Sequence, residues 1–304
     1  MIIHTIGDPH LGRKFEVGVP LNRRGEREAE QLAKLKAELA VPCDYNIMMG
    51  DLFDNANVSH AVVTQVAEAY LEAAKAYPNT TFLPMAGNHD LPRSLTSRGA
   101  WLSFKYMLEG IDAIWIVDRV TDFEDFTCIP WDWSCSAEEQ LAGLTKVAPR
   151  VYGHWDMMSF GGDDSHLCPT KRLVELGAQE IVSGHYHIAG EYEIDGVTVR
   201  CTGSMMPYTH GEDPEGKLYV TVSLEELLEN PAQFSDKCVR VLLQPGEILP
   251  TDIDCRALTM KRVKVAKEEL EIDLEEFDWA STMAKALAPL TPQVREFITN
   301  RLTT

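Results

Sequence analysis

Tyr45-Asn46-Ile47-Met48-Met49-Gly50-Asp51 joins an apolar run to a glycine and an aspartate. The run has the length and character of a buried strand, and Gly50 allows the backbone to turn tightly where the strand ends. The same arrangement occurs at the start of the chain, where residues 2–6 lead into Asp8-Pro9-His10. Strands that each end in polar residues predict an α/β fold whose chemistry lies at the carboxyl edge of a sheet.

Three further motifs follow predicted strands. Gly87-Asn88-His89-Asp90 comes after residues 81–84, Gly153-His154 after residues 151–153, and Gly184-His185-Tyr186-His187 after residues 180–182. Each motif alone is as well explained by a turn or a structural histidine. Five in one order are too many for that explanation, and together they offer enough carboxylate, amide and imidazole ligands for two adjacent divalent cations. A pair of such cations hydrolyses phosphate esters in many enzymes.

Helical and β patterns alternate over the first two-thirds of the chain. Helices are predicted over residues 26–39, 58–77 and 137–147, and further strands over residues 113–117 and 126–129. After His187 the pattern becomes that of antiparallel β structure. Residues 191–194 and 197–201 flank the hairpin turn Asp195-Gly196, and residues 218–222 and 239–243 continue the predicted sheet.

A change in composition predicts the domain organisation. Pro245-Gly246 and Pro250 punctuate the chain where the β pattern ends. We therefore expect a catalytic domain over residues 1–245 and a small C-terminal cap or partner-docking region over residues 246–304. That region holds a predicted acidic helix from residue 266 to about 287 and an amphipathic helix over residues 292–302.

The composition of the sequence indicates the cellular compartment of the protein. No apolar run approaches the roughly 20 residues that span a bilayer, which predicts no membrane insertion. The N-terminus lacks the basic start of a signal peptide. The seven cysteines are scattered and include no Cys-x-x-Cys pair, as expected in a reducing compartment. These features predict a cytoplasmic protein.

The net charge of −19 opposes non-specific binding of nucleic acid. Residues 11–36 differ from the rest, since they hold seven Lys or Arg against four Glu. Four of these basic residues follow His10 directly and are candidates for contact with DNA phosphates, although an ordinary solvated loop explains them equally well: Arg13, Lys14, Arg23 and Arg24.

The ordered motifs resemble the calcineurin-like metallophosphoesterase superfamily over about residues 1–225. Three features are similar to its SbcD-type DNA double-strand-break repair nucleases: His10-Leu11-Gly12 with the basic loop after it, Gly50-Asp51-Leu52-Phe53-Asp54, and Cys201-Thr202-Gly203-Ser204 with Gly211-Glu212. Thr202 stands where those nucleases have a proline. The resemblance implies a four-layer α-β-β-α sandwich with a small C-terminal cap or docking element.

The resemblance also implies roles for individual residues. One metal ion would be held by Asp8, His10, Asp51 and His187, and the other by Asp51, Asn88, His154 and His185, with Asp51 as the bridge. His89 would stabilise the transition state or protonate the leaving oxygen, and Asp54 would orient His89. Mn²⁺ is the implied metal, whereas the ligand types alone also allow Mg²⁺, Fe or Zn.

The resemblance implies that the protein is a manganese-dependent DNA nuclease of the SbcD type. We expect exonuclease activity and, in addition, endonuclease activity. The resemblance implies a homodimer, with helices near residues 58–77 as a candidate interface, and an SMC-like ATPase partner of the SbcC type. Two alternatives stay open. The net charge of −19 favours a small-molecule phosphodiesterase or phosphatase on the same fold, and a non-catalytic scaffold is the other.

Overall fold

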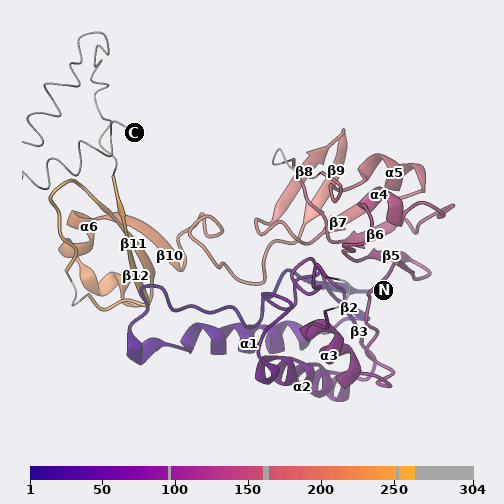
Figure 1. Ribbon diagram of the computed structural model, residues 1–304, viewed down its shortest axis with the longest axis horizontal. Helices are drawn as coiled ribbons and strands as arrows, with labels where there is room; N and C mark the ends of the chain where they lie inside the picture. Colours follow the sequence, from indigo (N-terminus) through magenta and orange to yellow (C-terminus); the bar gives the residue numbers. More distant parts are fainter. Residues whose placement is uncertain (95–96, 160–163, 251–252, 264–304) are drawn as a thin grey trace, which may run out of the picture. The chain divides into compact units, whose positions relative to one another are not determined.

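The computed structural model describes residues 1–94, 97–159, 164–250 and 253–263. Its first sheet consists of three parallel strands in the order β1 (Ile3–Ile6), β2 (Tyr45–Met48) and β3 (Thr81–Pro84). Helices α1 (Glu26–Leu39), α2 (His60–Ala76) and α3 (Ala100–Met107) pack on one face of this sheet (Figure 1). The predicted strand at residues 113–117 forms only isolated bridges, from Ile114 to Phe82 in β3 and from Val117 to Met85 directly after β3.

The second sheet has six strands in the order β4-β5-β6-β7-β9-β8. Two short helices, α4 (Ala137–Gln140) and α5 (Thr170–Glu175), cover one of its faces. The predicted helix over residues 137–147 is therefore much shorter, because the chain turns at Leu141 and reaches Gly143. The strands are β4 (Thr121–Asp122), β5 (Phe126–Ile129), β6 (Arg150–Gly153), β7 (Glu180–Ser183), β8 (Gly190–Ile194) and β9 (Val197–Cys201).

The two sheets pack face to face, which explains why their strands are apolar on both sides. Along β2, Ile47 packs between the sheets whereas Met48 packs under the helices. Along β6, Tyr152 packs between the sheets and Val151 packs under α4 and α5. Alternate residues of a strand point to opposite faces, so both faces of these central strands are buried. The predicted α-β-β-α sandwich is confirmed.

A third sheet corrects the prediction of continued antiparallel structure. Its strands β10 (Tyr219–Ser223), β11 (Cys238–Leu243) and β12 (Ala257–Arg262) are parallel. Helix α6 (Leu224–Glu229) starts directly where β10 ends, and η2 (Pro231–Phe234) follows it. Ser223 and Glu226 form a capping box that starts this helix. The helical crossover returns the chain to the same end of the sheet, so the next strand runs parallel.

The chain divides into a compact unit, Met1–Arg262, and a second unit, Val263–Thr304. Strand β12 lies past residue 245 and pairs with β11, so the predicted domain boundary falls inside the third sheet. The predicted acidic helix and the predicted helix over residues 292–302 lie outside the described residues. None of the helices in the described ranges combines the length and apolar character needed to cross a membrane.

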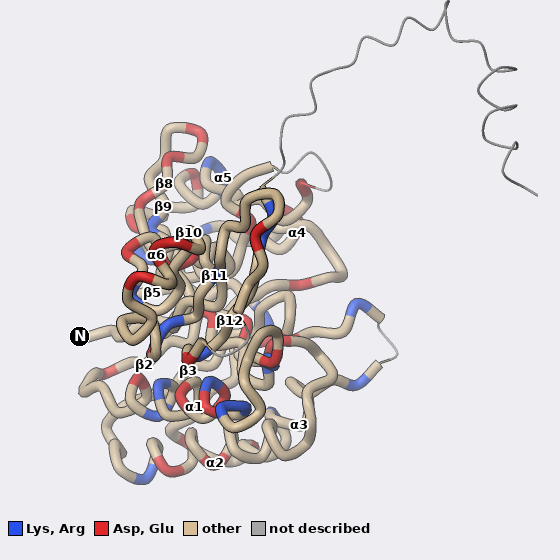
Figure 2. The backbone as a smooth tube through the Cα atoms, turned by 90° about the vertical axis from the view of Figure 1, so that its left-hand side faces the viewer, with Lys and Arg blue, Asp and Glu red and all other residues tan. Residues whose placement is uncertain are grey.

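The loop after His10 and helix α1 connect the third sheet to the sandwich. The backbone N–H of Leu258 donates to the carbonyl of Gly18 (2.9 Å), and Arg23 donates to the carbonyl of Ser235 (2.7 Å). Both terminal nitrogens of Arg256 donate hydrogen bonds to the carboxylate of Glu30. Acidic and basic residues alternate along α1, as Figure 2 shows, which supplies both partners of such contacts.

Candidate metal centre

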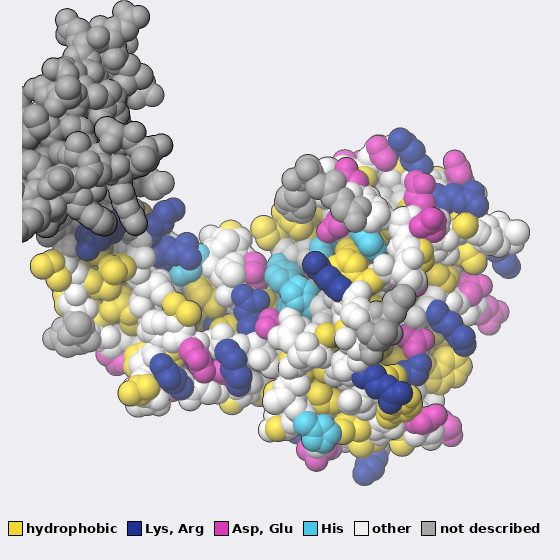
Figure 3. All heavy atoms as spheres, in the orientation of Figure 1, with side chains coloured by type: hydrophobic (Ala, Val, Ile, Leu, Met, Phe, Trp, Pro, Cys, Tyr) yellow, Lys and Arg dark blue, Asp and Glu magenta, His cyan; other side chains and the backbone are white. Residues whose placement is uncertain are grey.

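The polar motifs converge where the strands of both sheets end. Asp8 and His10 follow β1, Asp51 follows β2, and the Asn88 motif follows β3. His154 follows β6, and the His185 motif follows β7. Histidine side chains reach the surface there with Lys or Arg side chains beside them (Figure 3). The seven ligands predicted from sequence therefore lie together.

The first ligand cluster consists of Asp8, His10 and His187, whose ligand atoms lie within 4.8 Å of one another. Nε2 of His10 lies 3.0 Å from Nε2 of His187, which lies 3.6 Å from Oδ2 of Asp8. Both carboxylate oxygens of Asp8 are buried without a hydrogen-bond partner in the described structure. Burying an unpaired carboxylate is costly unless a cation compensates it. The donor set therefore fits a divalent metal ion.

The second cluster gathers Asn88, His154 and His185. Oδ1 of Asn88 lies 3.0 Å from Nε2 of His154 and 3.0 Å from Nδ1 of His185. The two histidine nitrogens are 3.2 Å apart. If the side-chain amide of Asn88 were reversed, its NH₂ group would point to the same two nitrogens. A bound cation would favour the orientation with the oxygen inward, because only the oxygen can bind a metal. With the oxygen inward, these are suitable ligands for a first-row metal.

Asp51 lies between the two clusters. Its Oδ2 is 3.7 Å from Nε2 of His10, and its Oδ1 is 3.4 Å from Nε2 of His154. Each carboxylate oxygen thus faces a different cluster. This arrangement suits a carboxylate that bridges two metal ions, as the resemblance implies.

Three of these residues hold an uncommon backbone conformation. His10, Asp51 and His185 have φ angles of 47°, 52° and 70°. Non-glycine residues seldom adopt this left-handed region, and such strain concentrates at functional sites. The neighbouring Gly50 has φ 108°, and a Cβ atom there would lie 2.1 Å from Nδ1 of His154. Glycine at position 50 therefore leaves the space that His154 occupies.

Outer hydrogen bonds orient the histidine rings. Nδ1 of His154 lies 2.8 Å from the carbonyl of Met49, Nε2 of His185 lies 2.7 Å from Oδ1 of Asp156, and Nδ1 of His187 lies 3.3 Å from Oε1 of Glu212. In the neutral form of each ring, an acceptor on one nitrogen keeps the proton there, so the other nitrogen can bind a metal. Sequence reasoning missed Asp156 and Glu212 as partners. The available signals were that Asp156 stands two residues after His154 and that Glu212 belongs to the Gly211-Glu212 pair.

His89 lies at the exposed rim of the site. Its backbone N–H donates to Oδ1 of Asp51 (2.9 Å), and its ring lies 4.8 Å from that of His10. The predicted contact with Asp54 exists, but Nδ1 of His89 donates to the Asp54 backbone carbonyl (2.5 Å) and not to the carboxylate. The carboxylate is instead 3.7 Å from Arg13 and 3.9 Å from Nδ1 of His10.

The contact of His89 with the Asp54 backbone predicts a mild effect of removing the Asp54 carboxylate. Asp54→Ala keeps the backbone carbonyl that holds His89, so we expect turnover of a phosphodiester to fall less than about tenfold, well below the effect of a lost general acid. Steady-state kinetics on the variant check this. A loss as large as that of His89→Ala would mean that the carboxylate itself positions His89.

Asp90 is a buried carboxylate that joins two of the ligand loops, and sequence reasoning gave it no role. It accepts backbone N–H groups from Leu52 (3.2 Å), Phe53 (2.8 Å) and Gly87 (2.8 Å). The first two belong to the Asp51 loop and the third to the Asn88 loop. One side chain therefore fixes the relative position of Asp51 and Asn88.

Asp90→Ala would leave these three N–H groups without their acceptor. We expect the free energy of unfolding to fall by about 1–3 kcal/mol or more, because buried donors then lack partners. Metal affinity should fall about 10–100-fold, as for other residues that support ligands. Urea unfolding and metal titration measure the two effects. Unchanged metal affinity would show that the loops hold their positions without Asp90.

Burial and mutual contact shift the protonation of the ligands in the metal-free protein. Burial raises the pKa of Asp8 to about 6 and lowers the pKa of His10 to about 3. Burial also opposes the charged form of His154, but the adjacent Asp51 carboxylate raises the pKa of His154 to about 9. His154 therefore carries a proton at neutral pH that a metal ion must displace.

These pKa values predict proton release on metal binding. His154 is protonated below about pH 9 and Asp8 below about pH 6, so the apparent affinity should rise with pH through both values. Adding Mn²⁺ to metal-free protein at pH 7 in weak buffer should release at least about one proton, from His154 and in part from His187, because the pKa of His187, although burial opposes its charged form, is raised by the hydrogen bond to Glu212. A pH electrode or calorimetry in two buffers detects it. Release of no proton would contradict the assignment of His154 as a ligand.

The four basic residues predicted to contact DNA have different surroundings. Arg13 lies beside the metal centre, 3.7 Å from Asp54, and Lys14 lines the neighbouring cavity. Arg23 forms ion pairs with Glu26, Asp236 and Asp254. Arg24 is exposed. Contact of any of them with DNA stays a prediction.

Comparison with known proteins agrees with the arrangement of ligands. No curated protein matches the sequence. The family model for the calcineurin-like phosphoesterase matches residues 1–189, which contain all seven predicted ligands. The chain belongs to the calcineurin-like phosphoesterase family.

Proposed function

We propose that this protein is a two-metal-dependent DNA nuclease of the SbcD type. Membership of the family supports metal-dependent hydrolysis of phosphoesters. The observation that carries the proposal is the position of Asp51, whose two oxygens face separate ligand clusters. Two divalent cations bound there would polarise a phosphodiester and make hydroxide available near neutral pH. Mn²⁺ is the cation we propose.

His89 is the group we assign to proton transfer. The Asp54 carbonyl accepts from Nδ1, so the remaining nitrogen, Nε2, is available to a substrate. A protonated ring can then donate from Nε2 to the leaving oxygen. The bond from the backbone of His89 to Asp51 fixes the ring next to the ligands. His89 thus acts on substrate and is not needed to hold a metal.

DNA as the substrate rests on the resemblance and on local charge. The protein has a net charge of −19, yet Arg13 lies beside the site and Arg93 stacks on Trp133, with its Cζ 4.9 Å from the ring centroid. Trp133 in turn donates to the carbonyl of Asn88 (3.3 Å). Basic and aromatic side chains next to the ligands suit a phosphodiester that carries bases.

Partners form part of the same proposal. We propose a homodimer and an SMC-like ATPase partner of the SbcC type. Sedimentation of the purified protein tests the first. A monomer at micromolar concentration would exclude a stable dimer.

A small-molecule phosphodiesterase on the same fold is the second candidate, favoured by the charge of −19. The test compares turnover of linear duplex DNA, cyclic nucleotides and a simple phosphomonoester, all with Mn²⁺. The nuclease proposal expects DNA to be the best substrate. Efficient hydrolysis of cyclic nucleotides or the monoester without cleavage of DNA would favour the second candidate.

A further inference from the structure

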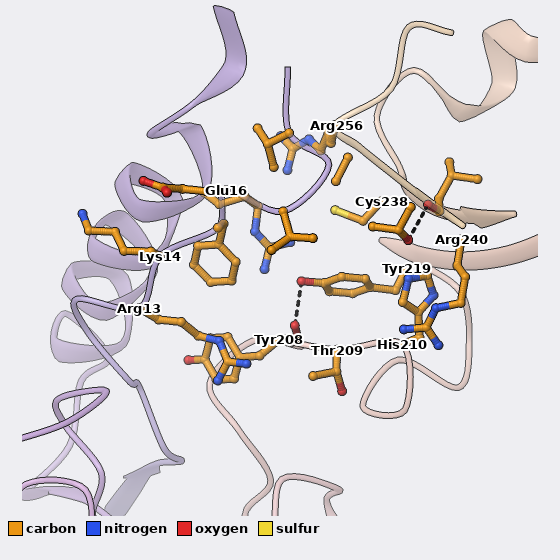
Figure 4. A pocket seen from close by; sticks show the side chains of 17 residues that line it. Arg13, Lys14, Glu16, Tyr208, Thr209, His210, Tyr219, Cys238, Arg240 and Arg256 are labelled. Carbon is orange, nitrogen blue, oxygen red and sulfur yellow. Dashed lines mark hydrogen bonds between the residues drawn. The ribbon is translucent and has the colours of Figure 1, made fainter. Parts of the chain in front are cut away.

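A cationic cavity lies next to the metal centre, between the loop after His10, helix α1 and the third sheet. Its volume is about 220 Å³, and side chains from these segments point into it (Figure 4). The lining includes five basic residues and a single acid, in a chain with a net charge of −19. The basic residues are Arg13, Lys14, Arg27, Arg240 and Arg256, and the acid is Glu16.

Arg27 is the unusual member of this set because it is buried without a counter-charge. The residue is 4% exposed and forms no ion pair within the described part of the chain. One nitrogen donates to the carbonyl of Pro207 (2.9 Å), whereas Nε and Nη1 have no hydrogen-bond partner. Arg256, by contrast, is paired with Glu30. A buried, unpaired guanidinium is costly, so an anion in the cavity is its natural partner.

Aromatic rings form the walls beside this guanidinium. Cζ of Arg27 lies 4.7 Å from the ring centroid of Phe15 and 5.4 Å from that of Tyr219. The rings of Phe15 and Tyr208 are nearly parallel, with centroids 6.2 Å apart. The hydroxyl of Tyr219 donates to the backbone carbonyl of Tyr208 (2.8 Å), which fixes one wall against the other (Figure 4). Aromatic faces next to arginines suit a base with its phosphate.

Tyr208 connects the cavity to the metal ligands. Its ring lies 5.4 Å from that of His10 and 5.9 Å from that of His187. Its hydroxyl donates to the backbone carbonyl of Pro9 (2.5 Å), and the carbonyl of Asp8 lies 3.1 Å from the same hydroxyl oxygen. Arg13 lies over the same ring, 5.2 Å from the centroid, and also reaches Asp54. The cavity and the metal ligands are therefore separated by the thickness of one side chain, that of Tyr208.

We propose that this cavity is a nucleotide subsite, which takes one nucleotide of the DNA strand that flanks the bond to be cut. Its phosphate pairs with Arg27, and its base lies against the wall of Phe15, Tyr208 and Tyr219. The assignment to a strand rests on the proposed nuclease function. The same chemistry would also accept a free nucleoside monophosphate, and the experiment separates the two sources.

The test measures binding by the full chain in EDTA, where no cleavage occurs. The probes are a fluorescein-labelled single-stranded oligonucleotide, followed by anisotropy, and dTMP, followed by calorimetry. Arg27→Met should weaken both at least about tenfold, because a charge-assisted contact is lost. Arg172→Gln, which changes a partly exposed arginine on α5 that pairs with Glu175, is the matched control and should bind as wild type does.

Circular dichroism establishes that each variant is folded. Arg240→Gln changes a second cationic residue of the cavity and should also weaken both probes, so the test stands even if Arg27→Met does not fold. Wild-type affinity for the oligonucleotide in the folded variants would overturn the strand subsite. Wild-type protein that cuts no DNA but binds dTMP through Arg27 would refute the nuclease function and leave a nucleotide site standing.

Discussion

Asp51→Ala is expected to reduce phosphodiester hydrolysis to background and to prevent binding of a metal pair. Asp51 is the residue whose carboxylate oxygens face both ligand clusters, at 3.7 Å from His10 and 3.4 Å from His154. Its removal takes a ligand from each proposed metal ion at once. Loss of any other single ligand removes one contact from one cluster. The substitution at Asp51 should therefore have the largest effect in the chain.

Metal content and turnover are both measured for this variant. Metal analysis after dialysis should show two Mn²⁺ per wild-type chain and fewer in Asp51→Ala, and kinetics on a phosphodiester should show no turnover above background. Asp112→Ala, which removes an exposed carboxylate, is the control and should bind metal and turn over as wild type does. Full activity in Asp51→Ala would contradict the bridging role.

His89→Ala is expected to keep both metal ions and to lose about 10²–10⁴ of the turnover, the usual contribution of a positioned acid or base. His89 is exposed, its ring is held by the Asp54 carbonyl, and the two metal clusters around it have their own ligands. Metal content separates this outcome from that of a ligand variant. Kinetics at saturating Mn²⁺ measure the turnover.

His60→Ala removes another exposed histidine, at the start of α2, and should leave both turnover and metal content unchanged. Unchanged turnover in His89→Ala would remove His89 from the chemistry. Loss of metal in that variant would instead make His89 a ligand, as its proximity to His10 and Asp51 allows.

The proximity of the candidate ligands was predictable because it depends on strand ends. The carboxyl ends of neighbouring parallel strands meet at one edge, so Asp8, Asp51 and Asn88 had to lie close together once the strands were recognised. His154 and His185 follow from the same rule in the second sheet. The spacing of polar residues after apolar runs thus predicted that these side chains meet, whereas their division between two metal ions is what the family resemblance implies.

Other contacts depend on information that is not local. The sequence does not show whether Asp54 presents its carboxylate or its carbonyl to His89, because that depends on the turn of the backbone. Arg27 belongs to a basic stretch, and its burial arises only where the third sheet meets α1. One local signal did predict the parallel direction of β11. The capping box of Ser223 and Glu226 predicts a helix between β10 and β11, and a helical connection suits parallel strands, but the strand pattern drew attention away from it.

Cleavage of end-labelled duplex and single-stranded DNA in Mn²⁺, with Asp51→Ala in parallel, tests the central claim most directly. A two-metal DNA nuclease should degrade at least one of these substrates, stop when EDTA is added, and show no cleavage in the variant. Absence of cleavage by wild-type protein that carries two Mn²⁺, or equal cleavage by Asp51→Ala, would contradict it.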